Sequence, residues 1–248
     1  MASPLVLVTG SAGRVGRAVV QELLARGHPV RALDRVTTPG VADCIVGDIT
    51  DPAICRRALS GVATLIHLAA TPDDVDDPVQ HLFTPNIVGV YHVFEAARAA
   101  GVQRMILASS GQVVWGQRTT GPLPITSEVQ PTPRGWYAAT KMFLEGAGRA
   151  FADAHGITVL VVRLGWCPRP GQEREIAASA WAQDVYLSPG DAGRFFACAV
   201  QAPLSTRFAV FYATSKALRQ CPYDLGPAMT LLGYEPRERW PDGIDPAL

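Results

Sequence analysis

The sequence lacks any long apolar run, although 48% of its 248 residues are hydrophobic. No segment reaches the roughly 18 to 20 consecutive apolar residues that a membrane-spanning helix needs, so we expect no membrane partner. The opening residues also lack a basic segment followed by an apolar one, so we expect no signal peptide. The absence of both segments predicts a cytoplasmic protein. The hydrophobic content predicts one sizeable hydrophobic core.

Charge of one sign is also lacking. Lys plus Arg and Asp plus Glu each number 22, so the formal net charge is zero. Without a basic field we expect no nucleic-acid partner. The five cysteines are scattered, with no CxxC pair and no Cys/His cluster, so we expect reduced thiols and no metal site. A small-molecule substrate is expected as a partner.

Short apolar segments alternate with amphipathic ones up to residue 165. The apolar segments predict strands at 4–10, 28–34, 42–51, 62–70, 104–110 and 157–165. Helical spacing of apolar residues predicts helices at 14–27, 52–60, 85–101 and 136–155. This alternation predicts an α/β fold, a doubly wound parallel sheet of the Rossmann type with helices on both faces.

Beyond residue 165 the alternation loosens and prolines recur. We predict a single domain, 1–248, whose core comprises 1–165 and a further strand at 207–214. The remainder is expected to form a small C-terminal substrate lobe, made of 166–206 and 215–248 with short helices near 191–201 and 224–232.

Three glycines, Gly10, Gly13 and Gly16, follow the first strand at the spacing G-x-x-G-x-x-G and lead into a helix. Glycine permits a tight turn and the close approach of a pyrophosphate, to which the helix N-terminus presents N–H groups. Asp34 ends the next strand, where a carboxylate can accept hydrogen bonds from ribose hydroxyls. We interpret this pattern as a dinucleotide site, and the alternative is a glycine-rich turn that only packs.

Asp34 favours NAD over NADP because its carboxylate would repel a 2′-phosphate. Arg14 and Arg35 stand where such a phosphate could be met, so NADP remains possible. Asp48 follows the third strand in "GDITD". It could flank the adenine, or it could be a carboxylate that only stabilises a turn.

Several short motifs occur together in a characteristic order: "TGSAGRVG", "GDITD", "HLAA" (67–70), "PNIVG" (85–89), "LASS" (107–110) and "YAATK" (137–141). In this order and spacing the chain resembles the short-chain dehydrogenases/reductases, in their extended, epimerase/dehydratase-like branch. The later segments "VVRLGWC" (161–167), "LSP" (187–189) and "LLGYEP" (231–236) are similar to those of uronate dehydrogenases within that branch.

The resemblance implies a Rossmann fold that binds NAD at the carboxyl ends of its strands. Asn86 supports the active site in this branch, although at a helix start it could equally be an N-cap. His67 ends a buried strand and is expected to be structural. The cofactor-binding residues are expected to be Gly10, Ala12, Gly13, Arg14, Val15, Gly16, Asp34, Arg35, Asp48, Ile49, Leu68, Ala69, Ala70, Asn86 and Lys141.

By resemblance, Tyr137 is the general acid/base and Lys141 its helper. Residues four apart share a helix face, so the ammonium of Lys141 is expected to lower the pKa of the Tyr137 phenol toward neutrality. Ser109 and Ser110 both offer a hydroxyl to hold the substrate oxygen. Uronate dehydrogenases use the second serine, which indicates Ser110. Gly111 stands where the branch usually has Ser or Thr.

The substrate is expected to be small and unactivated. Trp166 replaces the Asn with which nucleotide-sugar enzymes of this branch hold their donor, and little chain follows for a larger lobe. If the substrate carries a carboxylate, an arginine is its natural partner, with Arg174 the first choice and Arg169 the second. The substrate-binding residues are expected to be Thr71, Ser110, Gly111, Gln112, Tyr137, Trp166 and Arg174.

The favoured hypothesis is an NAD-dependent dehydrogenase that transfers a hydride from a small sugar acid of the uronate type, or a related hydroxy substrate, to nicotinamide. An epimerase or dehydratase that retains its NAD is the first alternative. A dinucleotide-sensing protein without catalytic activity is the second. Family members commonly pair through the helices expected at 85–101 and 136–155, so we expect a homodimer.

Overall fold

The computed structural model describes residues 4–203 and 206–244. Seven strands form one sheet in the order β3-β2-β1-β4-β5-β6-β7, and each neighbouring pair is parallel. The predicted doubly wound α/β sheet is therefore confirmed. The strands are β1 (Val6–Thr9), β2 (Val30–Asp34), β3 (Asp43–Val46), β4 (Thr64–His67), β5 (Arg104–Ser110), β6 (Thr158–Leu164) and β7 (Phe208–Ala213).

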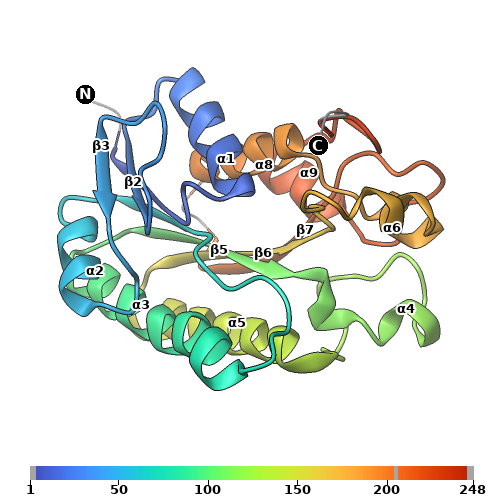
Figure 1. The fold of residues 1–248 in the computed structure, drawn as a ribbon, viewed down its shortest axis with the longest axis horizontal. Helices are drawn as coiled ribbons and strands as arrows, with labels where there is room; N and C mark the ends of the chain where they lie inside the picture. Colours follow the sequence, from blue (N-terminus) through green and yellow to red (C-terminus); the bar gives the residue numbers. More distant parts are fainter. Residues whose placement is uncertain (1–3, 204–205, 245–248) are drawn as a thin grey trace.

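Helices cover both faces of this sheet (Figure 1). One face carries α1 (Arg14–Ala25), α8 (Pro189–Gln201) and α9 (Gly226–Leu232). The other face carries α2 (Pro52–Leu59), α3 (Val90–Ala99) and α5 (Gly135–His155). The central strands are buried on both sides, which explains why their sequences are almost continuously apolar.

The helix expected at 85–101 differs from the observed one. A π-helix, η1 (Val79–Gly89), precedes α3 and contains Pro85. We placed the helix start at Pro85 because proline cannot donate the usual main-chain hydrogen bond. The wider turns of η1 already depart from the α-helical hydrogen-bonding pattern, so proline lies inside the element rather than at its start.

Four short helical elements near the carboxyl edge of the sheet were not predicted. Each has only four or five residues, too few for apolar periodicity to show in the sequence. The division into a core and a small C-terminal lobe stays a prediction. The four elements are η2 (Gly111–Val114), α4 (Gln117–Thr120), α6 (Glu173–Ala177) and α7 (Ala180–Asp184).

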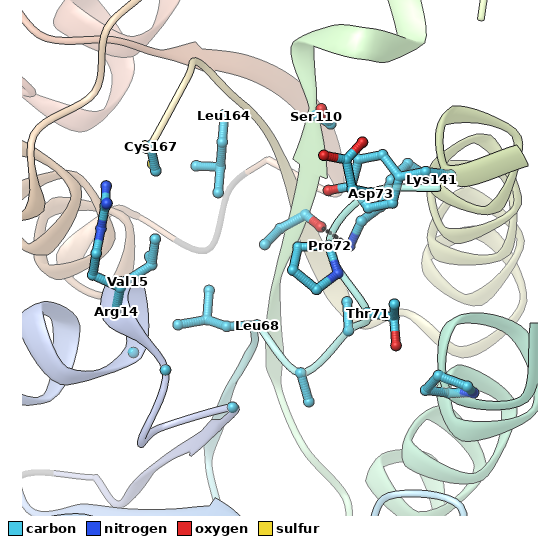
Figure 2. Close-up of a pocket in the computed structure, with 18 of the residues that line it drawn as sticks. Arg14, Val15, Leu68, Thr71, Pro72, Asp73, Ser110, Lys141, Leu164 and Cys167 are labelled. Atoms are coloured by element: carbon cyan, nitrogen blue, oxygen red, sulfur yellow. Dashed lines mark hydrogen bonds between the residues drawn. The ribbon is translucent and has the colours of Figure 1, made fainter. Parts of the chain in front are cut away.

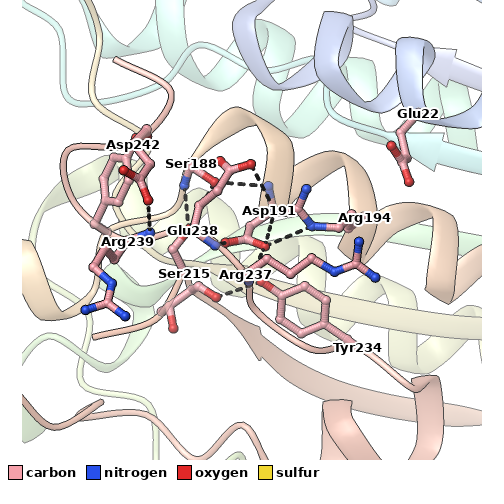
Figure 3. A network of polar contacts seen from close by, with 12 residues as sticks. Glu22, Ser188, Asp191, Arg194, Ser215, Tyr234, Arg237, Glu238, Arg239 and Asp242 are labelled. Carbon is pink, nitrogen blue, oxygen red and sulfur yellow. Dashed lines mark hydrogen bonds and ion pairs between the residues drawn. The ribbon is translucent and has the colours of Figure 1, made fainter. Parts of the chain in front are cut away.

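A buried carboxylate ties the C-terminal segment to α8 (Figure 3). Asp191 is fully buried and accepts hydrogen bonds from the backbone N–H groups of Arg237 and Glu238, at 2.9 and 3.0 Å. Arg194 forms a 2.6 Å ion pair with it, and Ser188 caps the helix by accepting from the N–H of Asp191. Neither Ser188 nor Asp191 lines the cleft.

Replacing Asp191 with Ala should remove this anchor and leave two part-buried N–H groups without an acceptor. We expect the free energy of unfolding to fall by about 3 kcal/mol, measured by urea denaturation. Asp153→Ala is the matched control, because Asp153 makes a largely exposed pair with Arg149, whose loss should cost less than about 0.5 kcal/mol. Equal losses in the two variants would contradict this role for Asp191.

Candidate active site

A cleft of about 1200 Å³ opens at the carboxyl ends of the parallel strands (Figure 2). This is where doubly wound sheets bind ligands. The volume leaves room for an extended ligand beside a small one. Every site residue expected from the sequence lines the cleft except Asn86 and Arg174.

The glycine turn between β1 and α1 is shaped by close backbone contacts. Gly10 has a φ of 69°, and a Cβ there would lie 2.7 Å from the backbone nitrogen of Ala69. A Cβ at Gly16 would collide with the carbonyl oxygen of Gly10. Both positions therefore require glycine. The bare turn brings the N-terminus of α1 to the cleft, where its N–H groups favour an anion such as a pyrophosphate.

Asp34, at the end of β2, is bound to this turn. One carboxylate oxygen accepts from the N–H of Ala12 at 2.9 Å, and the other accepts from the N–H of Arg35 at 2.7 Å. Each oxygen can accept a further hydrogen bond from a ribose hydroxyl. The carboxylate thus keeps the position expected of a residue that selects NAD.

Arg14 does not stand beside Asp34. Its side chain extends toward Cys167, which follows β6 (Figure 2), and β6 lies on the opposite side of β1 from β2. One buried guanidinium nitrogen of Arg14 has no partner among the residues that the structure describes. This orientation does not favour a contact between Arg14 and a 2′-phosphate, so that expectation stays a prediction, and Arg35 is the better placed of the two arginines.

Two other expected cofactor residues have clear local roles. Asp48 accepts from the N–H and the hydroxyl of Thr50, both at 2.9 Å, so it stabilises a turn while also lining the cleft. Ile49 is buried and packs against Gly89, in the space that a side chain at Gly89 would occupy. Leu68, Ala69 and Ala70 form the wall after β4.

Asn86 does not line the cleft itself but binds a loop that does. It lies inside η1, so it is not an N-cap, and its buried amide accepts from the N–H of Thr71 at 2.8 Å and donates to the Thr71 carbonyl at 3.0 Å. It also donates to Thr140 on α5 at 3.2 Å. Asn86 therefore fixes the loop after β4, which carries Thr71 into the cleft. Its position does not provide a direct contact with the cofactor.

Tyr137 and Lys141 face the cleft from the first turns of α5. The N–H of Tyr137 donates to Asp74, 63 residues away, at 2.7 Å. This bond supplies the helix start with the acceptor that Arg134, at the N-cap, does not provide. The Lys141 amine donates to the carbonyl of Ala108 at 2.9 Å and lies 5.6 Å from the Tyr137 ring centroid.

The electrostatics of this pair differ from our expectation. Burial raises the pKa of Tyr137 above its usual value, and a hydrogen bond with Ser110 opposes the shift only in part. Burial also lowers the pKa of Lys141 to about 8. The expected lowering of the tyrosine pKa by the lysine is therefore wrong for this arrangement, because loss of solvent outweighs it. His67 is buried, with its pKa lowered to about 3, and it pairs with Thr9 as a neutral structural residue.

The structure separates the two serines. Ser109 donates to Glu145 at 2.6 Å, inside a buried network in which Glu145 also binds Arg163 at 2.9 Å. Ser110 instead contacts the Tyr137 phenol and accepts from the N–H of Gln112 at 3.1 Å. Ser110 is thus the hydroxyl available to a substrate.

The substrate end of the cleft is aromatic and carries opposed charges. Trp166 lines it as expected, but Arg174 is exposed outside it. On the short helix α6 the buried residue is Ile176, two positions from Arg174, and such positions face different ways. Arg169 lines the cleft, paired with Asp73 at 2.8 Å.

Several lining residues were not found from the sequence. Asp73 and Asp74 read only as turn residues, since their partners lie far along the chain. The aromatic residues come from unpredicted segments and carried no spacing signal. The missed residues are Asp73, Asp74, Trp115, Trp181 and Tyr223.

Comparison with known proteins agrees with this geometry. A family model described as the NAD dependent epimerase/dehydratase family matches residues 6–182. The L-arabinose 1-dehydrogenase (NAD(P)(+)) of Haloferax volcanii is 31% identical, over 94% of this chain and 96% of its own. The chain belongs to the NAD-dependent epimerase/dehydratase family.

Uronate dehydrogenases are also similar to this family member. That of Agrobacterium fabrum is 30% identical over 74% of this chain and 69% of its own length. A solved structure of a mutated uronate dehydrogenase superposes with a TM-score of 0.80 at 29% identity, covering 96% of this chain and 83% of that one. The expectations of an extended-branch dehydrogenase and of NAD as cofactor are confirmed. Within the described residues, no helix is long and apolar enough to cross a membrane.

The site residues fit a bound dinucleotide. The glycine turn lines the cleft, where a pyrophosphate could approach its backbone, and the unpartnered nitrogen of Arg14 near Cys167 is a donor that an anion would satisfy. Asp34 stands at the ribose position. These residues would hold NAD, which would accept a hydride when bound.

Burying Lys141 should cost this enzyme stability. Below pH 8 the amine is charged in both the folded and unfolded chains, so burial penalises the folded state. Lys141→Met should therefore raise the free energy of unfolding at pH 7 by about 2 kcal/mol, after allowing for the lost bond to Ala108.

The stability difference between Lys141→Met and the wild type should depend on pH. Between pH 8 and 10.5 the unfolded chain holds a proton that the folded amine has released, so wild-type stability rises with pH and the advantage of the variant shrinks. Denaturation at several pH values measures this, with Lys216→Met as control because Lys216 is exposed. An advantage that stays constant to pH 10.5 would contradict it.

Proposed function

We propose that this protein oxidises the C1 hydroxyl of a small free sugar to a lactone, with NAD as the acceptor. The grouping of Ser110, Tyr137 and Lys141 at one end of the cleft carries this proposal. Three hydroxyl- or amine-bearing side chains there can hold one substrate oxygen and the cofactor ribose. The family and its sugar-oxidising relatives support the same chemistry.

The side chains divide the work. Ser110 donates to the C1 oxygen and orients it, and Tyr137 as phenolate accepts the hydroxyl proton while the C1–H bond breaks. NAD, when bound, would accept the hydride, so the sugar loses one hydride and one proton, which is two electrons and two protons in all. Lys141 positions the nicotinamide ribose and favours the phenolate. Because burial raises the pKa of Tyr137, the phenolate is scarce near neutrality, and the oxidation rate should rise with pH.

A neutral aldose fits the cleft better than a sugar acid. The charges of Asp73 and Arg169 act on the Tyr137 phenol with opposite signs, and Arg169 is already paired with Asp73. Arg169 also donates to the Pro72 carbonyl at 2.9 Å. A substrate carboxylate would have to displace Asp73 and then lie close to it.

A uronate remains the second candidate, because Arg169 does line the cleft. Its side chain is 48% exposed and that of Asp73 is 50% exposed. Such a pair contributes only about 0 to 1 kcal/mol, so a carboxylate substrate could separate it at small cost. The uronate dehydrogenases among the relatives also favour this candidate.

The first test is the absorbance of NADH with a panel of aldoses, their matching uronates and hydroxysteroids. We expect turnover with free aldoses, and a loss of about 10²- to 10⁴-fold in kcat for Tyr137→Phe, with NAD affinity unchanged. Retained turnover in that variant would contradict the proposed role of Tyr137. Tightly bound nucleotide without net NADH would favour the epimerase or dehydratase instead.

The second test concerns the Asp73–Arg169 pair. Asp73→Asn should raise the ratio of kcat/KM for glucuronate to that for glucose by about tenfold, because it frees Arg169 and removes a like charge. Asn tolerates the positive φ of 102° found at Asp73, so the loop should keep its shape. Competing turnover of the two sugars measures the ratio.

Two further variants serve as controls for this test. Asp76→Asn makes the same charge change on the same loop outside the cleft, and it should leave the ratio unchanged. Adding Arg169→Gln to Asp73→Asn should cancel the gain. A wild-type enzyme that already prefers uronates would contradict the neutral-aldose assignment and direct attention to Arg134, which also lines the cleft.

The homodimer and the cytoplasmic location stay predictions. Exposed apolar side chains on η1, α3 and α5 favour a dimer, and Trp136 packs edge-on against Phe83 to join two of these elements. The exposed residues concerned are Val79, Val88, Tyr91, Trp136 and Phe143.

A further inference from the structure

A tyrosine from the C-terminal segment enters the catalytic end of the cleft. Tyr223 lies between β7 and α9, and it lines the cleft together with Ser110 and Tyr137. Its hydroxyl occupies the place of a side chain on Gly111, since a Cβ there would collide with the Tyr223 oxygen. Gly111 is therefore glycine because Tyr223 fills its space.

The Tyr223 hydroxyl has no hydrogen-bond partner among the described residues, unlike two other buried tyrosines in this part of the chain. Tyr212 donates to the carbonyl of Thr126 at 3.1 Å, and Tyr234 donates to the carbonyl of Thr214 at 2.7 Å. Because Tyr223 lines the cleft, a bound ligand can accept a hydrogen bond from this hydroxyl. Burial also raises the pKa of Tyr223, so the hydroxyl stays protonated and can donate.

The ring is held firmly in place. It stacks on Tyr212, with centroids 4.5 Å apart and planes within 5°, and it meets Trp181 edge-on at 6.0 Å. The backbone on either side bonds to Ile125, through Pro222 at 2.7 Å and Asp224 at 3.0 Å. A hydroxyl fixed in this way loses little freedom when it binds a ligand.

We propose that Tyr223 is a substrate-binding residue whose hydroxyl donates to a sugar hydroxyl next to the oxygen held by Ser110 and Tyr137. This inference rests on the proposed function. Sugars carry a hydroxyl on nearly every carbon, so a fixed donor beside the reacting carbon selects both the orientation of the ring and the configuration of the neighbouring centre. The C-terminal segment thereby supplies a hydrogen bond that Gly111 has no side chain to make.

Tyr223→Phe removes this hydroxyl and keeps the stacked ring. We expect kcat/KM for the best sugar to fall about 10- to 100-fold, with thermal stability unchanged or slightly higher. Tyr234→Phe is the matched control, because its hydroxyl bonds within the fold, away from the cleft. That variant should lose stability and keep kcat/KM. Unchanged kcat/KM in Tyr223→Phe would overturn the inference.

Singly deoxygenated sugars separate binding from a structural role. The wild type should discriminate against one deoxy sugar, the one lacking the hydroxyl that Tyr223 contacts, and Tyr223→Phe should lose that discrimination alone. A uniform loss across all the sugars would overturn the inference. The double variant Tyr223→Ala, Gly111→Ser, which returns a hydroxyl to the same space, should recover part of the activity lost in Tyr223→Ala.

Binding is read separately from turnover. Tryptophan fluorescence should report sugar binding, since Trp181 packs against Tyr223. A wild-type protein that binds sugars without oxidising them would overturn the proposed function, and a weaker affinity in Tyr223→Phe would still support this inference. Equal affinities in the two proteins would overturn it. Absence of sugar binding to the wild type would overturn both.

Discussion

The buried ion pair between Glu145 and Arg163 fixes the position of the catalytic helix. Glu145 lies one turn beyond Lys141 on α5, and Arg163 lies on β6, with side chains only 11% and 3% exposed. Burying two charges is costly unless their hydrogen bonds are satisfied, and here Ser109 and Tyr212 complete them. The pair therefore holds α5 in one register against the sheet, which brings Tyr137 and Lys141 to the cleft. Tyr212 in turn supports the ring of Tyr223, so one network orders both sides of the reacting centre.

The two ends of the cleft are formed in different ways. At the dinucleotide end the turn between β1 and α1 carries glycines, because Gly10 and Gly16 have no room for a Cβ. At the substrate end, aromatic rings and paired charges from several loops meet. These side chains determine the shape and the charge of that end of the cleft. The first end can be encoded by a few adjacent residues. The second requires segments that are distant in sequence to meet.

Most of the fold and the cofactor end could be predicted from the sequence for this reason. Buried parallel strands and amphipathic helices each follow from local composition, and the glycine spacing with Asp34 lies within one βαβ unit. Tyr137 and Lys141 were predicted because they belong to a short motif, "YAATK", by which the sequence resembles its family. The helix start at Pro85 was misplaced, since local propensity does not anticipate the π-helical turns around it.

The sequence by itself determined the sheet, the glycine turn and the tyrosine–lysine pair, because each depends on residues within a few positions of one another. Only the tertiary structure decided which serine hydroxyl is bound to Glu145, which arginine is neutralised and what fills the space beside Gly111. Asp74 reaches Tyr137 across 63 residues, and Arg169 reaches Asp73 across 96. Such contacts depend on how the loops at the sheet edge pack against one another. The periodicity of apolar residues in the sequence does not predict that packing.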